Sequence, residues 1–313
     1  MIFYDASVPR SGNVSSLQIS TKLFHQEVSP MNFQGVVAKV SKGDLHYALG
    51  RFRTVRLAYG AMRRLTDGRV SLQQNGCSST LFPDADIKNI VQTISKEAVF
   101  LGLNLPANIV AEIESFARSE PLHTNYDPHG PTFQYADVRR GKAPDGRSVP
   151  IGGIREPTRC PAVQAVVNDP VLRSIVRNYL GHEPREVMTI INWSFASDFS
   201  DEERRRLRHH VIDYHYDVGG YNFVYANFYI TDTDCYSGAH VMMKRSHNRK
   251  PLRMLLGSAS ASEARVRKQF GIENEITIEG PAGTGFVQDT SCYHRATPPT
   301  HGDRLMLAVR FIN

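Results

Sequence analysis

From residue 186 to the C-terminus the chain repeats one pattern, short runs of β-branched and aromatic residues separated by turn-forming residues. The first run, Glu186–Phe195, includes Val187, Ile190, Ile191 and Trp193. Later runs lie at about 211–217, 222–231, 239–243, 275–279, 284–289 and 304–312. Strands at this spacing with few intervening helices predict an antiparallel sandwich or jelly roll. We therefore expect a mainly β protein with a jelly-roll core at about 186–313.

Helices are predicted to flank this core. Apolar residues recur at helical spacing between Asp84 and Ser95, and again after Pro106. The pair Asp169-Pro170 starts a further helix, which Gly181 ends. Residues 1–80 are expected to form an N-terminal extension of unknown function packed on the core, with a helix within Lys42–Leu65. Residues 81–313 then form the functional domain.

Two polar segments break the pattern. Ser119–Pro157 has no periodicity and is long for a connection, so we expect a structureless lid or substrate loop. Asp198–His210 is highly charged and lies before the run at 211–217, and we expect a mobile lid there. Its arginines Arg204, Arg205 and Arg206 are interpreted as a solvated helix face, since no aromatic residues interleave with them as in a nucleic-acid site.

Composition narrows the class of protein. The 313 residues carry a formal net charge of +6, which favours an anionic small molecule as substrate. The four cysteines are widely spaced and contain no C-x-x-C pair, which argues against a structural zinc site and favours a reducing, cytoplasmic location. No apolar run reaches membrane-spanning length, and no membrane or nucleic-acid partner is expected. Oligomeric state is left open.

A His-x-Asp pair begins the central part of the β region. In a strand, residues i and i+2 point to the same face, so His215 and Asp217 can converge on one point. Two such ligands and a distant histidine make a 2-His-1-carboxylate triad, which holds non-haem Fe(II) and leaves three positions open. A single His-x-Asp arises easily by chance, so the rest of the chain has to supply the third ligand.

A second group of residues precedes the last strand. The segment from Asp289 to Arg304 places His294 at a strand end and Arg304 at the start of the final run. A fixed guanidinium can hold the far carboxylate of a dicarboxylate by paired hydrogen bonds. Each residue alone also has a structural interpretation, as a core histidine or a surface charge. Because His294 and Arg304 follow His215 and Asp217 in this order, the functional interpretation is favoured.

These residues together resemble a known family. The His-x-Asp, the Ser-Gly-Ala-His-Val…Arg-Ser-His segment (Ser237 to His247) and the Asp-Thr…His-Arg…Gly-x-Arg segment are similar to the phytanoyl-CoA dioxygenase family. That family comprises non-haem Fe(II), 2-oxoglutarate-dependent oxygenases built on a double-stranded β-helix, a cupin-like jelly roll. The resemblance extends from about Asn168 to Phe311 and does not include the first eighty residues.

The resemblance implies specific roles. It makes His215, Asp217 and His294 the iron ligands and catalytic residues, and Arg304 the anchor of the 2-oxoglutarate side-chain carboxylate. Asn227 stands where family members often have a tryptophan that contacts the cosubstrate, and Asn192 falls at another contact position. For Asn192 a packing role is an equal alternative.

This chain departs from the family at two further positions. Ala296 replaces a serine, and Lys244-Arg245-Ser246-His247 lacks the usual glycine. His240 and His247 are interpreted as structural hydrogen-bonding residues, and Cys292 as a packing residue.

The implied function is hydroxylation of a small molecule with 2-oxoglutarate and O2 as cosubstrates and succinate and CO2 as products. Asp217 occupies the position that halogenating relatives replace by a small residue, which favours hydroxylation. Desaturation, epimerisation and ring formation use the same oxidant and stay open. The alternative from another class is a jelly-roll ligand-binding protein with a vestigial metal site. Arg304 argues against it, because ligand binding alone places no demand on that arginine.

Overall fold

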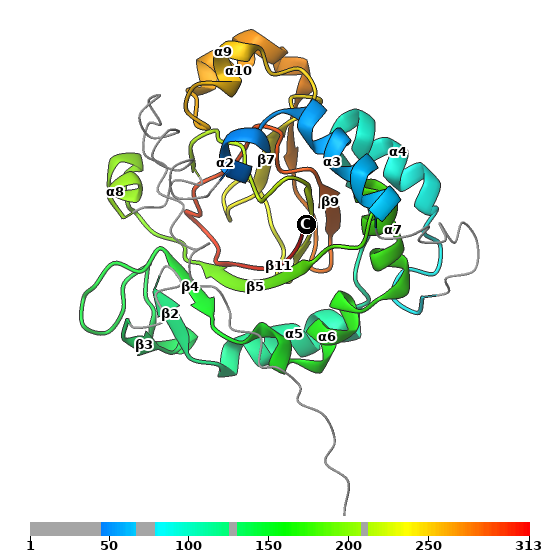
Figure 1. The fold of residues 1–313 in the computed structure, drawn as a ribbon. Coiled ribbons are helices and arrows are strands. Elements are labelled where there is room, and N and C mark those ends of the chain that lie inside the picture. The colour runs from blue at the N-terminus through cyan, green and yellow to red at the C-terminus, as the bar shows by residue number, and fades with distance from the viewer. Residues whose placement is uncertain (1–44, 67–78, 125–129, 208–211) are drawn as a thin grey trace, which may run out of the picture.

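The computed structural model describes residues 45–66, 79–124, 130–207 and 212–313 (Figure 1). Its strands are β1 Val99–Leu101, β2 Leu122–Thr124, β3 Thr132–Phe133, β4 Ile151–Ile154, β5 Glu186–Ser194, β6 Phe223–Tyr229, β7 His240–Met243, β8 Glu275–Ile278, β9 Gly285–Gln288, β10 His294–Ala296 and β11 Arg304–Ile312. Its α-helices are α2 Leu45–Leu49, α3 Arg53–Thr66, α4 Ile87–Glu97, α5 Ala107–Ser119, α6 Pro161–Val167, α7 Pro170–Leu180, α8 Asp201–Arg206, α9 Leu252–Leu255 and α10 Glu263–Phe270.

The strands form two antiparallel sheets. The large sheet has the order β1-β9-β6-β11-β5-β4-β2-β3, and the small sheet has the order β10-β7-β8. An antiparallel bridge between His215 and His294 adds the chain at residue 215 to the small sheet. From β5 onward the chain passes from the large sheet to the small one at residue 215, and back to β6. It then runs through β7 and β8 of the small sheet to β9 of the large one, and from β10 to β11. This winding between two sheets is a double-stranded β-helix, so the jelly-roll prediction is confirmed.

Side-chain alternation along β11 separates the core from the interior of the barrel. Leu305, Leu307, Val309 and Phe311 point outward and are fully buried in the main hydrophobic core. That core also contains apolar residues of α4, α5, α6 and α7, which lie outside the large sheet in Figure 1. The intervening residues of β11 line a cavity between the sheets. The period-2 rule therefore places the polar residues of this strand inside the barrel.

The predicted helices are confirmed, and their ends follow from capping. The Asp169 side chain accepts hydrogen bonds from the backbone amides of Val171 and Leu172, and Pro170 occupies the first turn of α7. Gly181, with φ 82°, ends the helix in the left-handed conformation that glycine adopts without steric cost. In the N-terminal region the helical pattern is split into α2 and α3.

The expectation of a structureless Ser119–Pro157 segment is wrong. It contains β2, β3 and β4, and β4 pairs with β5, with Ile151 opposite Ser194. The sequence of β4, Ile-Gly-Gly-Ile, lacks the side chains that signal a strand. A Cβ on Gly152 would lie 3.1 Å from side-chain atoms of both Leu122 and Phe195, so close packing explains the glycine. Residues 125–129 lie outside the described part of the chain.

Two further expectations are corrected between β5 and β6. The run at 211–217 forms isolated bridges at His215 in place of a continuous strand, and residue 211 is not described. Arg204 of α8 is buried, contrary to the solvated face expected for it, and it donates to the carbonyl oxygens of Ser197 at 2.9 Å and Pro299 at 3.2 Å. Arg205 and Arg206 are exposed, as predicted.

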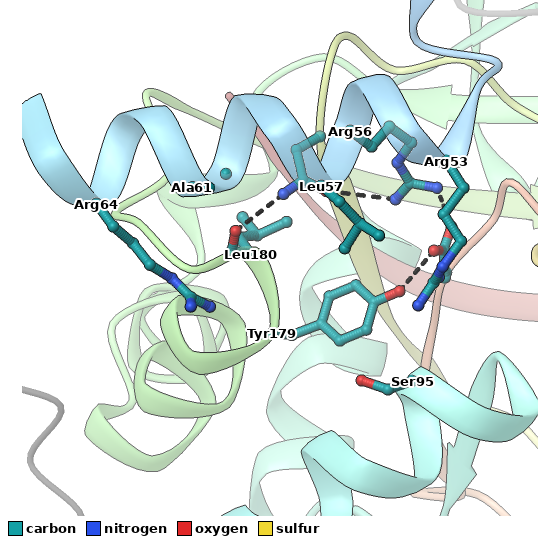
Figure 2. A pocket seen from close by; sticks show the side chains of 11 residues that line it. Arg53, Arg56, Leu57, Ala61, Arg64, Ser95, Tyr179 and Leu180 are labelled. Atoms are coloured by element: carbon teal, nitrogen blue, oxygen red, sulfur yellow. Dashed lines mark hydrogen bonds and ion pairs between the residues drawn. The ribbon is translucent and has the colours of Figure 1, made fainter.

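Helix α3 is joined to the core by a buried ion pair. Arg56 donates to Asp289 Oδ1 at 3.0 Å and to Ser291 Oγ at 2.6 Å, and its guanidinium lies over the ring of Phe223. From α7, the Tyr179 hydroxyl donates to Asp289 Oδ2 at 2.5 Å (Figure 2). Burial by itself would raise the pKa of Asp289, but the charge of Arg56 and these hydrogen bonds hold it well below its usual range. Helix α3 and helix α7 therefore meet on one carboxylate.

Removing Arg56 should unfold the protein more easily, because it leaves the Asp289 carboxylate buried and unpaired. We expect Arg56→Met to lower the free energy of unfolding by about 3–5 kcal/mol. In Arg56→Met combined with Asp289→Asn, most of this loss should be recovered. Arg53→Met on the same helix is the matched control, with a change of less than about 0.5 kcal/mol. Urea denaturation measures all three, and a loss below about 1 kcal/mol in Arg56→Met would contradict the assignment.

Candidate functional site

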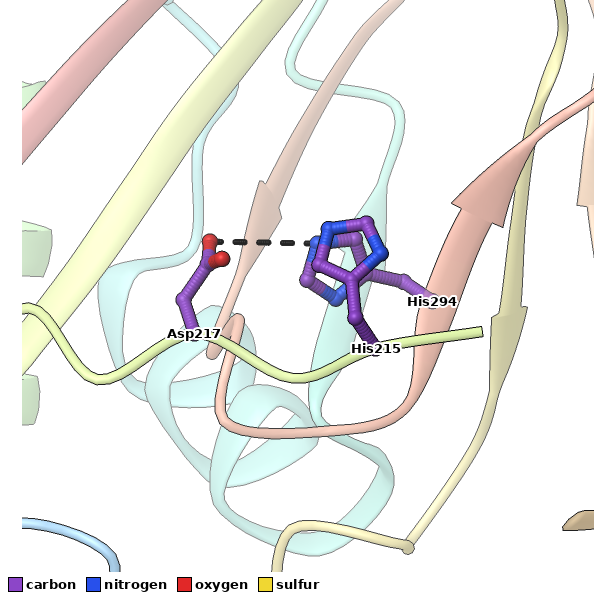
Figure 3. A group of neighbouring side chains, drawn as sticks. All are labelled: His215, Asp217 and His294. Atoms are coloured by element: carbon purple, nitrogen blue, oxygen red, sulfur yellow. Dashed lines mark ion pairs between the residues drawn. The ribbon is translucent and has the colours of Figure 1, made fainter. Parts of the chain in front are cut away.

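His215, Asp217 and His294 come together at one end of the small sheet (Figure 3). One potential ligand atom from each lies within 4.8 Å of the other two. Asp217 Oδ2 is 3.8 Å from His294 Nε2, and the two imidazole rings have centroids 4.4 Å apart. The cluster unites a segment before β6 with the first residue of β10, so the fold brings together residues that are far apart in sequence.

Backbone carbonyl groups orient both imidazoles. His215 Nδ1 lies 2.9 Å from the carbonyl oxygen of Asp213, and His294 Nδ1 lies 3.0 Å from that of Cys292. In each case the acceptor belongs to the residue two positions earlier. A carbonyl can only accept, so each Nδ1 carries the proton and each Nε2 keeps its lone pair for the centre of the cluster. This is the arrangement in which histidine binds a metal ion.

The backbone also sets the spacing of the three residues. His215 and His294 exchange amide-to-carbonyl hydrogen bonds of 2.9 and 2.8 Å, which fixes them as a directly opposed pair. The Asp217 amide donates to the Thr290 carbonyl oxygen at 2.8 Å. Thr290 and Cys292 belong to the turn 289–293 that Arg56 and Tyr179 hold through Asp289. The turn therefore links the buried ion pair to the position of all three side chains.

A cavity of about 190 Å³ separates the cluster from the large sheet. Its floor consists of inward-facing residues of β5, β6 and β11, and His240 of the small sheet also lines it. Strand register arranges the floor in rows across the sheet, with Ser194 beside Arg304, Asn192 beside Met306, and Ala308 between Ile190 and Asn227. The cavity thus has a cationic end at Arg304, and the two rows beyond it each combine apolar side chains with one asparagine.

Arg304 is buried at one end of this floor and held by two groups. One terminal nitrogen donates to Ser194 Oγ at 3.1 Å, and the other donates to the carbonyl oxygen of Gly238. Gly238 belongs to the Ser-Gly-Ala-His segment noted in the sequence, which gives that segment a role in fixing the guanidinium. Arg304 consequently presents a rigid, planar group of donors to the cavity.

Asn192 and Asn227 are buried and face the same cavity, on strands on either side of β11. Asn192 donates to Ser194 Oγ at 3.4 Å, so it shares a partner with Arg304. Ala296, where a serine was expected, also lines the cavity. Both asparagines therefore lie within the same enclosed space as Arg304 and the cluster.

Burial controls the protonation of two histidines that line the cavity, His294 and His240. It lowers the pKa of His294 to about 4, with the charge of His215 adding to the effect and Asp217 opposing it. His240, whose ring is stacked on that of His294 at 5.3 Å, also has its pKa lowered well below the usual value, by burial first and then by the charges of His294 and Arg304. Both rings are thus neutral at neutral pH, and His294 keeps a lone pair available.

Other candidate residues lie elsewhere. His123 is on β2, outside the cluster, and His129 lies outside the described residues. His247 contacts the carbonyl oxygen of Ser95 at 3.1 Å, consistent with a structural hydrogen-bonding role. Cys292 is buried among apolar side chains next to β9, and Gln288 donates to its sulfur at 3.3 Å.

Three residues in or next to the cavity had no role assigned from the sequence. Ser194 and Gly238 bond Arg304, and Arg310 lines the far end of the floor. Arg310 could have been found, because it lies six residues after Arg304 and thus on the same face of the final strand. Ser194 and Gly238 could not, since their contacts depend on pairing between distant segments.

No family model matches the sequence, and no curated protein matches it. Solved structures do match. One is the epimerase SnoN from nogalamycin biosynthesis in complex with Fe3+, alpha ketoglutarate and nogalamycin RO, with 13% identity, a TM-score of 0.47, and coverage of 72% of this chain and 83% of that one. Another is the non-heme alpha ketoglutarate dependent carbocyclase SnoK, with 13% identity, a TM-score of 0.47, and coverage of 76% and 87%. A third is EctD from S. alaskensis in its apoform, with 15% identity, a TM-score of 0.46, and coverage of 75% and 81%.

These identities and TM-scores are too low to transfer a reaction or substrate to this chain. Among the described helices, none has the length and apolar character to cross a bilayer. The order in which the strands alternate between the two sheets is enough to define the fold, without comparison with any other protein. The chain is a double-stranded β-helix with two histidines and an aspartate clustered between its sheets.

Proposed function

We propose that this protein is an Fe(II)- and 2-oxoglutarate-dependent dioxygenase that hydroxylates a small molecule. The observation that carries the proposal is the convergence of His215, Asp217 and His294 on a cavity that also holds the fixed guanidinium of Arg304. The overall reaction consumes substrate, 2-oxoglutarate and O2, and yields hydroxylated substrate, succinate and CO2. One oxygen atom enters the substrate and the other enters succinate.

The three clustered side chains fit Fe(II). Two imidazole nitrogens and one carboxylate oxygen are the donors of the facial triad, which leaves positions for a cosubstrate and O2. Both Nε2 atoms are already turned to the centre by the carbonyl contacts of Nδ1. Iron bound there would supply the oxidative chemistry. The protein supplies ligand direction and an enclosed pocket.

The cavity floor fits 2-oxoglutarate. Arg304 offers two parallel donors to a carboxylate, and its contacts with Ser194 and Gly238 restrict its movement. Asn192, one row from Arg304, and Asn227, two rows from it, add amide groups, and we propose that they contact the cosubstrate. Met306 and Ala308 add apolar surface in the same two rows, which limits the access of water to the reacting groups.

Hydroxylation is proposed over halogenation because Asp217 completes the triad and leaves no ligand position for a halide. Desaturation, epimerisation and ring formation require the same donors and differ in substrate placement. The alternative of a ligand-binding protein with a vestigial metal site gives no reason for a buried arginine at this position.

Loss of a triad residue should abolish iron binding. We expect the anaerobically loaded parent to hold one Fe(II) per chain, and His215→Ala, Asp217→Ala and His294→Ala to lose most of it while keeping the far-UV circular dichroism of the parent. The exposed His301 gives the matched control, and His301→Ala should retain iron. Metal analysis after gel filtration provides the measurement. Full iron retention by the Asp217→Ala, His294→Ala double variant would disprove the assignment.

Arg304 should determine the affinity for 2-oxoglutarate. Because removal of one partner leaves a carboxylate unpaired in the pocket, a cost of about 2–5 kcal/mol is typical. We expect Arg304→Ala to weaken binding at least about tenfold, which corresponds to about 1.4 kcal/mol. Arg304→Lys should be intermediate, since lysine keeps the charge and loses the planar fork. Iron content should not change.

Anaerobic titration of the Fe(II) protein, followed by metal-to-ligand charge-transfer absorption, measures this affinity. The exposed Arg253→Ala serves as the control and should titrate like the parent. If Arg304→Ala also titrates like the parent, the cosubstrate site is wrongly assigned and the ligand-binding alternative gains support.

A further inference from the structure

A second arginine faces the cavity at the opposite end of β11. Arg310 follows Arg304 by six residues, so its side chain lies on the same inward face, with Met306 and Ala308 between them. At about 3.3 Å per residue the two backbone positions are about 20 Å apart. The cavity therefore has a cationic group at each end of its floor.

Each guanidinium stays at its own end. Ser194, the partner directly opposite Arg304 in the strand register, accepts one of its hydrogen bonds. Tyr225, directly opposite Arg310, lies beneath the guanidinium, with Cζ 5.0 Å from the ring centroid. The four carbon–carbon bonds of 2-oxoglutarate, each about 1.5 Å, span less than about 6 Å. One cosubstrate molecule anchored at Arg304 consequently leaves Arg310 for another ligand.

Arg310 has no carboxylate partner among the residues that the structure describes, and its buried Nε has no hydrogen-bond partner there. Other half-buried arginines differ. Arg267 is paired with Glu275 at 2.6 Å, and Arg245 with Glu97 at 2.8 Å. A guanidinium that lines a pocket and is not paired with an acid attracts an anion, and its planar donors match a carboxylate.

The sum of the charges in the loaded cavity indicates that the primary substrate would supply this anion. Fe(II), Asp217, doubly charged 2-oxoglutarate and Arg304 sum to zero. Arg295 also lines the cavity but is paired with Glu263 at 3.5 Å, so Arg310 leaves the loaded cavity with one unpaired positive charge. The row of the floor next to Arg310 consists of Ile190, Ala308 and Asn227, so two of its three side chains are apolar. A molecule with an anionic end at Arg310 and an apolar body along this row would lie beside the cluster.

We propose that Arg310, supported by Tyr225, binds the carboxylate of the primary substrate, which is a small acid with an apolar body. This proposal rests on the proposed function for the place of the reacting carbon, but the binding site itself needs neither iron nor 2-oxoglutarate. The structure thus assigns different carboxylates to the two arginines of one strand, the cosubstrate to Arg304 and the substrate to Arg310.

The test uses benzoate as probe and its neutral analogue benzamide as reference, with binding measured by isothermal titration calorimetry to the metal-free protein. We expect benzoate to bind more tightly than benzamide to the parent, and Arg310→Gln to lose at least about tenfold in benzoate affinity without change for benzamide. Arg310→Lys, which keeps the charge without the fork, should be intermediate. If Arg310→Gln fails to fold, the benzoate affinity of Arg310→Lys provides the test in its place. The exposed Arg253→Ala is the matched control and should bind benzoate like the parent.

A second readout separates the two arginines. In the anaerobic Fe(II) protein, 2-oxoglutarate affinity should stay within about twofold of the parent in Arg310→Gln and fall in Arg304→Ala. Equal benzoate affinity in the parent and Arg310→Gln overturns the proposal, as does loss of 2-oxoglutarate binding in Arg310→Gln alone. If the parent shows no charge-transfer absorption, the proposed function fails, while the calorimetric result still decides whether Arg310 binds a carboxylate.

Discussion

The buried carboxylate of Asp289 connects the outer helices to the cluster of His215, Asp217 and His294. It accepts hydrogen bonds from Arg56 on α3 and Tyr179 on α7, and it begins the turn that leads to His294. The same turn supplies the carbonyl groups of Thr290 and Cys292, which fix Asp217 and the His294 ring. A shift of this turn would move all three clustered side chains together, so their geometry depends on a charge pair that touches none of them.

Joining a helix to a core by a buried ion pair costs free energy, because both charges lose their hydration. The hydrogen bonds around Asp289 offset this cost, because its two oxygens have partners from three separate segments: Arg56 on one side, Tyr179 on the other, and the Ser291 amide within the turn. An apolar contact would hold α3 as firmly but would not direct the turn. We infer that positional control of the turn is the reason for the charge.

The second constraint is the alternation along β11. Its outward residues are buried against α4, α5, α6 and α7, and this packing fixes the register of the strand. Because the register is fixed, Arg304 and Arg310 must both face inward, one beside Ser194 and the other beside Tyr225. The same hydrophobic packing that stabilises the barrel therefore sets the distance between its two interior cations. Fold stability and the spacing of the two arginines have a common origin in this strand.

Local sequence patterns predict much of the fold and of the cluster, because they show which residues of a single segment face solvent and which face an apolar core. The strand runs predicted the jelly roll, the Asp169-Pro170 and Gly181 signals bounded α7, and the His-x-Asp with His294 indicated the cluster that the structure forms. Tertiary structure decided what depends on contacts between distant segments. It showed that the Ile-Gly-Gly-Ile segment forms strand β4 and that Arg204 is buried. It also showed that the Gly238 carbonyl accepts a hydrogen bond from Arg304, and that Arg56 is paired with Asp289 of the turn. None of these has a local signal, because each exists only once the chain has brought its two partners together.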